Sequence, residues 1–126
     1  MTKLLLVDDS AVMRKIIQRN IKETGLIVDE FVEAGDGNQA LEKVNENLDL
    51  DLILLDWNMP NMSGLEFVKT LRSLNLAKRI PVVMVTTEGS DAKISEAKDS
   101  GADGYLTKPF TADQLRDALG SYLMVQ

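Results

Sequence analysis

Acids, a hydroxyl side chain and one lysine directly follow short apolar runs in this sequence. They are Asp8 and Asp9, Asp56 with Asn58 close behind, Thr86 and Lys108. Clustered carboxylates repel one another and stay together only around a cation. All-oxygen ligands favour a hard ion, and a protein shell that leaves room for water suits Mg²⁺. An aspartate between such a metal and a lysine is suited to accept a phosphoryl group, because the lysine and a hydroxyl can bind the anion.

The apolar pattern explains how these side chains can meet. Short apolar runs are typical of strands covered on both faces, and they occupy residues 3–7, 27–32, 52–55, 82–85 and 104–107. Amphipathic stretches alternate with them and predict helices over residues 10–24, 36–48, 63–71, 90–100 and 111–123. This alternation implies an α/β fold, an open doubly wound five-stranded parallel sheet with five helices. Ligands of such sheets lie at the carboxyl ends of the strands, where the polar residues converge.

Composition excludes several classes of chemistry. The 126 residues are 44% hydrophobic and 27% charged, which is ordinary for one globular domain. The lack of cysteine excludes disulfides and thiolate sites, and the lack of histidine excludes Ser-His-Asp catalysis and histidine metal ligands. A net charge of −6 disfavours nucleic-acid binding, and the apolar runs are too short for a signal peptide or membrane span. We therefore expect a cytoplasmic protein with no membrane or nucleic-acid partner, in which residues 1–126 form one domain.

Each candidate residue, taken alone, has a simpler explanation. Asp8 and Asp9 can be strand-end acids, and Asp9 or Ser10 can be a helix N-cap, a position where aspartate and serine are preferred. Asp56 can begin a loop, Lys108 can be a solvated lysine, and Thr86 can end a strand. Their occurrence at four separate strand ends is what favours a shared site.

Together these residues resemble the signature of response-regulator receiver domains of two-component signalling. The shared motifs are Asp8-Asp9, Asp56-Trp-Asn-Met-Pro-Asn-Met62, Gly64-Leu65-Glu66, Met84-Val-Thr86 with Glu88, Gly104-Tyr105 and Lys108-Pro-Phe110. The resemblance covers essentially the whole chain and is strongest to the chemotaxis branch of the family. It implies a flavodoxin-like receiver fold and a phosphoacceptor switch, which catalyses only its own phosphorylation and dephosphorylation.

The resemblance also implies roles for the residues of the site. Asp56 is the expected acceptor of a phosphoryl group from a histidine kinase. Asp9, Asp56 and the backbone carbonyl of Asn58 are the expected direct ligands of Mg²⁺, and Asp8 is expected to bind it through a water. Lys108 is expected to pair with a phosphoryl oxygen.

Other positions are expected to transmit or limit the signal. Thr86 is expected to move to the phosphoryl group, and Tyr105 to turn inward as it does so; without the other motifs, Tyr105 would be only a half-exposed aromatic. Asn58 and Glu88 are expected to flank the phosphoryl group and set how quickly water removes it. The predicted output surface is the fourth helix, fifth strand and fifth helix, because the fourth helix is the least apolar and the easiest to shift.

The implied partners are a histidine kinase as phosphodonor, a downstream protein such as the flagellar motor switch, and a phosphatase, and the chain is expected to be a monomer. Several surface residues depart from enteric chemotaxis members. Thr87 stands where the family usually has a small residue, and its bulk is expected to narrow access to the phosphoryl site, so the kinetics of the family are not carried over. Asp91 and Lys93 differ from a basic pair, and Ala118 replaces a lysine, on surfaces that normally meet the kinase and the motor switch. The identity of kinase and target therefore stays open.

Two alternatives to a stand-alone switch also stay open. The chain can be a receiver domain excised from a larger regulator. It can also be a small phosphatase with an aspartyl nucleophile, although the haloacid-dehalogenase enzymes that it would resemble have a second acid where Asn58 stands. A nucleotide-binding protein is disfavoured, because no glycine-rich loop follows the first strand.

The peptide bond between Lys108 and Pro109 is predicted to be cis. Such bonds are retained in folds where a tight geometric demand holds them. Here the demand is to aim Lys108 back over the strand ends while Thr111 caps the next helix. The resemblance to receiver domains points the same way.

Overall fold

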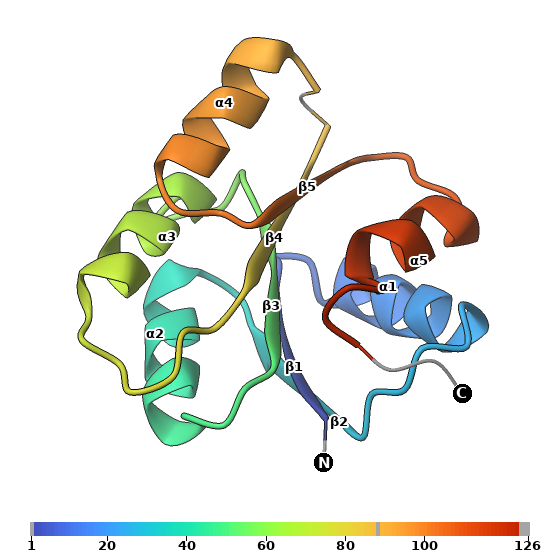
Figure 1. Ribbon diagram of the computed structural model, residues 1–126, viewed down its shortest axis with the longest axis horizontal. Coiled ribbons are helices and arrows are strands. Elements are labelled where there is room, and N and C mark those ends of the chain that lie inside the picture. Colours follow the sequence, from blue (N-terminus) through green and yellow to red (C-terminus); the bar gives the residue numbers. More distant parts are fainter. Residues whose placement is uncertain (1, 88, 124–126) are drawn as a thin grey trace.

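A single parallel sheet forms the centre of the computed structural model, which describes residues 2–87 and 89–123 (Figure 1). Its five strands lie in the order β2-β1-β3-β4-β5. The strands are β1 (Lys3–Val7), β2 (Glu30–Ala34), β3 (Leu52–Asp56), β4 (Val82–Thr86) and β5 (Gly104–Thr107). The helices between and after them are α1 (Ala11–Glu23), α2 (Gly37–Glu46), α3 (Gly64–Ser73), α4 (Asp91–Asp99) and α5 (Ala112–Leu119). The predicted doubly wound α/β fold is confirmed.

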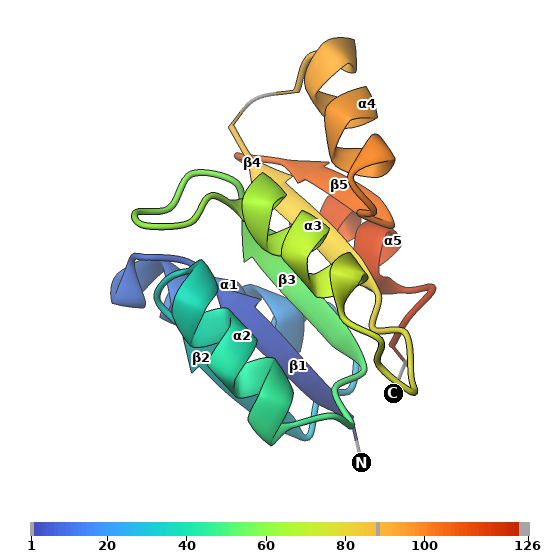
Figure 2. The same ribbon diagram turned by 90° about the vertical axis from the view of Figure 1, so that its left-hand side faces the viewer.

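Helices cover both faces of the sheet, which is why the central strands are apolar throughout. Every residue of β3 and β4 is buried. Along β1, Leu5 faces the core under α2, α3 and α4, while Leu4 faces the core under α1 and α5. Figures 1 and 2 show α1 and α5 on one side of the sheet and α2 and α3 on the other. Among the described residues, no helix is long and apolar enough to cross a membrane.

The sequence pattern misplaces the start of β2 and the end of α5. The strand begins at Glu30 rather than at Ile27, because β1 begins at Lys3 and its register pairs Lys3 with Glu30. Residues before Glu30 therefore lie beyond the start of the neighbouring strand. The helix ends at Leu119, and Leu123 is buried from the turns that follow it.

A side-chain cap begins each helix soon after the strand before it. The capping oxygens, each of which accepts a hydrogen bond from a backbone N–H of the first turn, belong to Ser10, Asp36, Ser63, Ser90 and Thr111. Thr111 and Gln114 form a reciprocal capping box, in which the side chain of each accepts a hydrogen bond from the backbone N–H of the other. These caps hold the loops at the carboxyl ends of the strands, where the candidate site lies.

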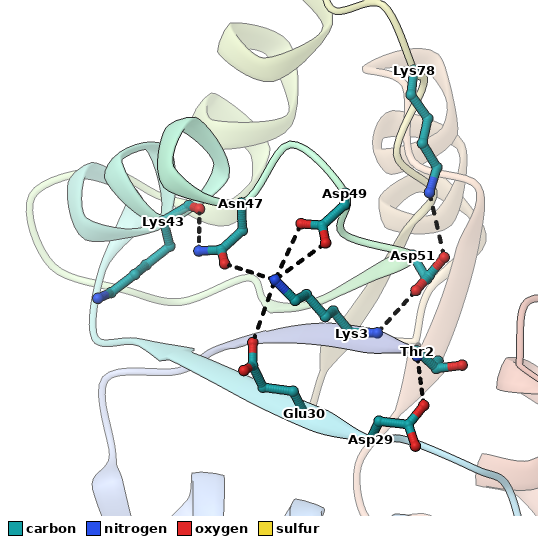
Figure 3. A network of polar contacts seen from close by, with 9 residues as sticks. All are labelled: Thr2, Lys3, Asp29, Glu30, Lys43, Asn47, Asp49, Asp51 and Lys78. Carbon is teal, nitrogen blue, oxygen red and sulfur yellow. Dashed lines mark hydrogen bonds and ion pairs between the residues drawn. The ribbon is translucent and has the colours of Figure 1, made fainter.

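At the amino ends of the strands, which form the opposite edge of the sheet, charged side chains make a network around Lys3 (Figure 3). The Lys3 ammonium lies 3.2 Å from a carboxylate oxygen of Asp49 and 3.7 Å from one of Glu30, and it donates to Asn47. The hydrogen bond to Asp49 raises the pKa of Lys3. The Lys3 backbone N–H donates to Asp51. At this edge the acids have a lysine and backbone donors as partners, so the network fastens β1 to its neighbours.

A second polar cluster fastens the end of α3 to the turn before β5. Arg72 donates to the carbonyl oxygens of Gly101 and Ile80 and to the carboxylate of Asp103, at 3.0, 2.8 and 3.0 Å. Gly101 has φ +114°, and a Cβ there would lie 2.6 Å from Cγ of Arg72. Glycine at position 101 therefore permits both the left-handed turn and the close approach of the arginine.

Replacement of Arg72 by methionine should lower the free energy of unfolding by about 1 to 3 kcal/mol, because it removes three hydrogen bonds of a charged, mostly buried donor. Urea denaturation measures the loss. Arg116→Met is the matched control, because Arg116 is exposed on α5 and should change stability by less than about 0.5 kcal/mol. Equal effects of the two substitutions would contradict a structural role for the Arg72 cluster.

Candidate functional site

Three carboxylates meet at the carboxyl edge of the sheet. Asp8 and Asp9 directly follow β1, and Asp56 is the last residue of the neighbouring strand β3. One carboxylate oxygen from each of the three lies within 4.8 Å of the other two. Asp8 and Asp56 are buried, whereas Asp9 is exposed. These three carboxylates, here called the acidic pocket, are open to solvent on the Asp9 side.

Lys108 supplies positive charge to this pocket. Its ammonium nitrogen lies 3.5 Å from Oδ2 of Asp8 and 3.8 Å from Oδ1 of Asp56. Its backbone N–H donates to the carbonyl oxygen of Thr86 at 2.7 Å, so the chain after β5 stays against β4. The Lys108–Pro109 bond is cis, as predicted.

One buried carboxylate oxygen lacks a hydrogen bond. Oδ1 of Asp8 accepts from the backbone N–H of Ser10 at 2.9 Å, whereas Oδ2 is buried and accepts no hydrogen bond. A buried charge without a donor is costly, and the ammonium of Lys108 is too far for a short ion pair. Three carboxylates, one of which carries this oxygen, fit a hard divalent cation such as Mg²⁺, which takes a few carboxylates and completes its shell with waters.

The pKa of Asp56 is raised to about 6. Burial is the main cause, because it disfavours the charged form of a carboxyl group. Lys108 opposes this shift, the neighbouring charges of Asp8 and Asp9 add to it, and the backbone N–H of Asn58 lowers it. Asp56 is thus a carboxylate kept in an unfavourable charged state, which a cation would relieve.

The loop between β3 and α3 is held close beneath Asp56. A Cβ on Gly64 would lie 2.5 Å from the carbonyl oxygen of Asp56, so only glycine lets α3 begin there. Asn61 has a left-handed φ of +67°, and its side-chain amide donates to Asp36 at the start of α2. Asn58 lies in this loop with an exposed side chain.

Thr86 and Tyr105 lie on neighbouring strands beside the pocket. Thr86 ends β4 and is fully buried, and Tyr105 of β5 is half-buried. The Tyr105 ring meets the ring of Trp57 edge to face, with centroids 6.4 Å apart. Glu88, the other residue expected near the phosphoryl group, lies outside the described residues.

Arg14 is a site residue that the sequence analysis missed. Its guanidinium donates to the backbone carbonyl oxygen of Asp8 and to Oε1 of Glu33, the latter at 2.9 Å. Arg14 thus connects α1 to the end of β1 and to β2. Position 14 falls one turn after the Ser10 cap, but an arginine on a helix surface is common and gives no specific signal in the sequence.

Comparisons with known proteins agree with this geometry. The profile of the response regulator receiver domain matches residues 4–120. The chain is 43% identical over 117 residues to the chemotaxis protein CheY1 of Helicobacter pylori, covering 93% of each chain. It is 40% identical over 121 residues to a CheY homologue of Campylobacter jejuni, covering 96% of this chain and 92% of the other. The solved structure of CheY4 from Vibrio cholerae superposes with a TM-score of 0.84 at 40% identity, over 98% of this chain and 99% of the other.

This chain belongs to the response regulator receiver domain family. Within it, the sequence and fold are those of a receiver domain of the CheY type.

The raised pKa of Asp56 predicts an unusual pH dependence of stability in metal-free protein. In the folded protein Asp56 is protonated below about pH 6, whereas in the unfolded chain it is protonated only below its ordinary pKa of 3.8. In that interval the folded state binds more protons, so the free energy of unfolding falls as the pH rises. From about pH 5 to about pH 7.5, the free energy of unfolding of wild type should fall by about 1 to 1.5 kcal/mol relative to that of Asp56→Asn.

Urea denaturation in EDTA at the two pH values measures this difference. Asp99→Asn, which changes an exposed acid at the end of α4, is the control and should follow wild type at both. If the gap between wild type and Asp56→Asn is the same at both pH values, the buried carboxyl titrates normally in the folded protein.

Proposed function

We propose that this chain is a phosphorylation switch of the chemotaxis type, which accepts a phosphoryl group on Asp56 from a histidine kinase in a Mg²⁺-dependent reaction. The observation that carries the proposal is the cluster of Asp8, Asp9 and Asp56 within 4.8 Å, with the Lys108 ammonium beside Asp8 and Asp56. Membership of the receiver family and the similarity to chemotaxis proteins support it.

In this proposal the chain's own residues orient the acceptor. A carboxylate oxygen of Asp56 attacks the phosphorus, the bond from phosphorus to the histidine nitrogen of the donor breaks, and the leaving imidazole takes the electron pair and then a proton. Asp9, Asp56 and the carbonyl oxygen of Asn58 hold Mg²⁺, with Asp8 bound through a water. When bound, this ion neutralises oxygens of donor and acceptor together.

Lys108 and Thr86 act on the product. The Lys108 ammonium already faces Asp56 at 3.8 Å and is placed to pair with a phosphoryl oxygen. The Thr86 hydroxyl moves to donate a hydrogen bond to another phosphoryl oxygen, and Tyr105 then turns inward. Asn58 and Glu88 limit the access of water to the phosphoryl group. The chain thus acts as a switch and modifies no separate substrate.

The output surface of the proposal is α4, β5 and α5. In the described part of α4 only Ala97 is buried, whereas α1, α2, α3 and α5 each bury two or more residues. A helix with few buried contacts costs little to displace. A downstream protein that binds the displaced arrangement more tightly reads the signal, because only such a difference can bias the equilibrium.

Mass spectrometry after incubation with acetyl phosphate and Mg²⁺ tests the reaction. Wild type should gain one phosphoryl group that is absent in EDTA and absent in Asp56→Asn. Asp99→Asn, an exposed acid outside the pocket, should be labelled like wild type. Labelling that persists in Asp56→Asn, or that is unchanged by EDTA, would refute the proposal.

NMR with Mg²⁺ and beryllofluoride, a phosphoryl mimic, tests the switch. In wild type, amide resonances should shift around Asp56 and also at Ile94, Tyr105 and Leu115. In Thr86→Ala, the shifts around Asp56 should persist while the distant ones shrink, because the hydroxyl that links the two is gone. If wild-type shifts stay confined to the pocket, the α4-β5-α5 surface does not carry the output.

A further inference from the structure

Lys93 of α4 lies over the ring of Trp57. Its ammonium nitrogen is 5.1 Å from the ring centroid, within the range of a cation–π interaction. Trp57 directly follows the acceptor Asp56 in the chain, and its ring also contacts Tyr105 edge to face. Two side chains, one from α4 and one from β5, thus contact the ring of Trp57 in the loop after β3.

This contact holds the part of α4 that is otherwise most weakly attached. The far end of the helix is fixed, because Ala97 is buried in the core and Arg72 of α3 donates to the carbonyl oxygen of Gly101 just after the helix. Near the start of the helix, the residues around Lys93 are exposed or half-buried, and Ala97 is the one buried residue within the described α4. An interaction at position 93 therefore acts where the helix can move most.

We propose that Lys93 is a positioning residue that holds the first turns of α4 against Trp57 in the phosphate-free protein and so sets how readily the switch turns on. This inference rests on the proposed function and concerns a residue that regulates it. Displacement of α4 away from the loop after β3 would break the contact between the ammonium and the ring. By linkage, an interaction that favours the phosphate-free arrangement lowers the affinity for any ligand that favours the other.

The linkage fixes the direction of the effect. Loss of a cation–π interaction at a partly exposed site should raise the apparent affinity for a phosphoryl mimic about two- to fivefold. Loss of one positive charge, acting through space alone, would instead weaken the binding of an anion. A rise in affinity on removal of Lys93 thus cannot come from the charge itself.

Three variants separate these effects in the full chain. Lys93→Met removes the cation and keeps an apolar side chain of similar length, and Lys93→Arg keeps the cation over the ring. Lys98→Met removes the same charge from the exposed surface of α4. The measurement is a titration with beryllofluoride at saturating Mg²⁺, followed by the amide resonance of Gly64 next to Asp56.

The midpoint for Lys93→Met should lie about two- to fivefold below that of wild type, and those of Lys93→Arg and Lys98→Met should not fall below it. An equal or higher midpoint for Lys93→Met, or an equal decrease in Lys98→Met, would overturn the inference. Wild type that does not respond to beryllofluoride would instead mean that the proposed function fails.

The emission of Trp57, the one tryptophan in the chain, tests the contact itself without metal or mimic. It should change in Lys93→Met and stay like wild type in Lys98→Met. An unchanged emission of Lys93→Met would show that the ammonium does not lie over the ring in solution, and this too would overturn the inference.

Discussion

The constraint on which the site depends is the burial of negative charge at the carboxyl edge of the sheet. Asp8 and Asp56 are buried beside each other, one oxygen of Asp8 accepts no hydrogen bond, and the pKa of Asp56 is raised to about 6. Lys108 offsets only part of this cost at 3.5 and 3.8 Å. In the proposed function, a bound cation relieves this cost, and the phosphorylated carboxylate is then held by both the metal and the lysine.

The rest of the fold maintains that costly arrangement. The four strands β1, β3, β4 and β5 end at the same edge, and a capped helix begins soon after each of them. At the opposite ends of the strands, Lys3 pairs with Asp49 and Glu30, which are exposed, and the buried acids among the described residues are Asp8 and Asp56. The stability of the apolar sheet thus compensates for the cost of burying carboxylates at the carboxyl ends of the strands.

Much of the fold and of the pocket could be predicted from sequence, because both follow from short-range patterns. Continuous apolar runs identify the buried strands, and parallel topology then brings Asp8, Asp56 and Lys108 together without any knowledge of distances. The predicted start of β2 is wrong, because apolar residues before Glu30 indicate burial but do not indicate which strand they pair with.

Other features depend on contacts between elements distant in sequence, which no local pattern reports. The bond from Arg14 to the carbonyl oxygen of Asp8, the missing hydrogen bond on that carboxylate and the position of Lys93 over Trp57 all belong to this class. In the sequence, Lys93 is only a departure from a basic pair on a polar helix. Its contact with Trp57, the residue after Asp56, becomes visible only when α4 is placed beside β5 and the loop after β3.

The ¹³C NMR titration of the Asp56 carboxyl group is the most direct measurement of the central claim. Without metal, the midpoint should lie at about pH 6, and saturating Mg²⁺ should move it to lower pH, because a bound cation favours the carboxylate. A metal-free midpoint near the ordinary aspartate value of about 4, or a midpoint that Mg²⁺ leaves unchanged, would contradict the account of a buried acidic pocket relieved by a cation.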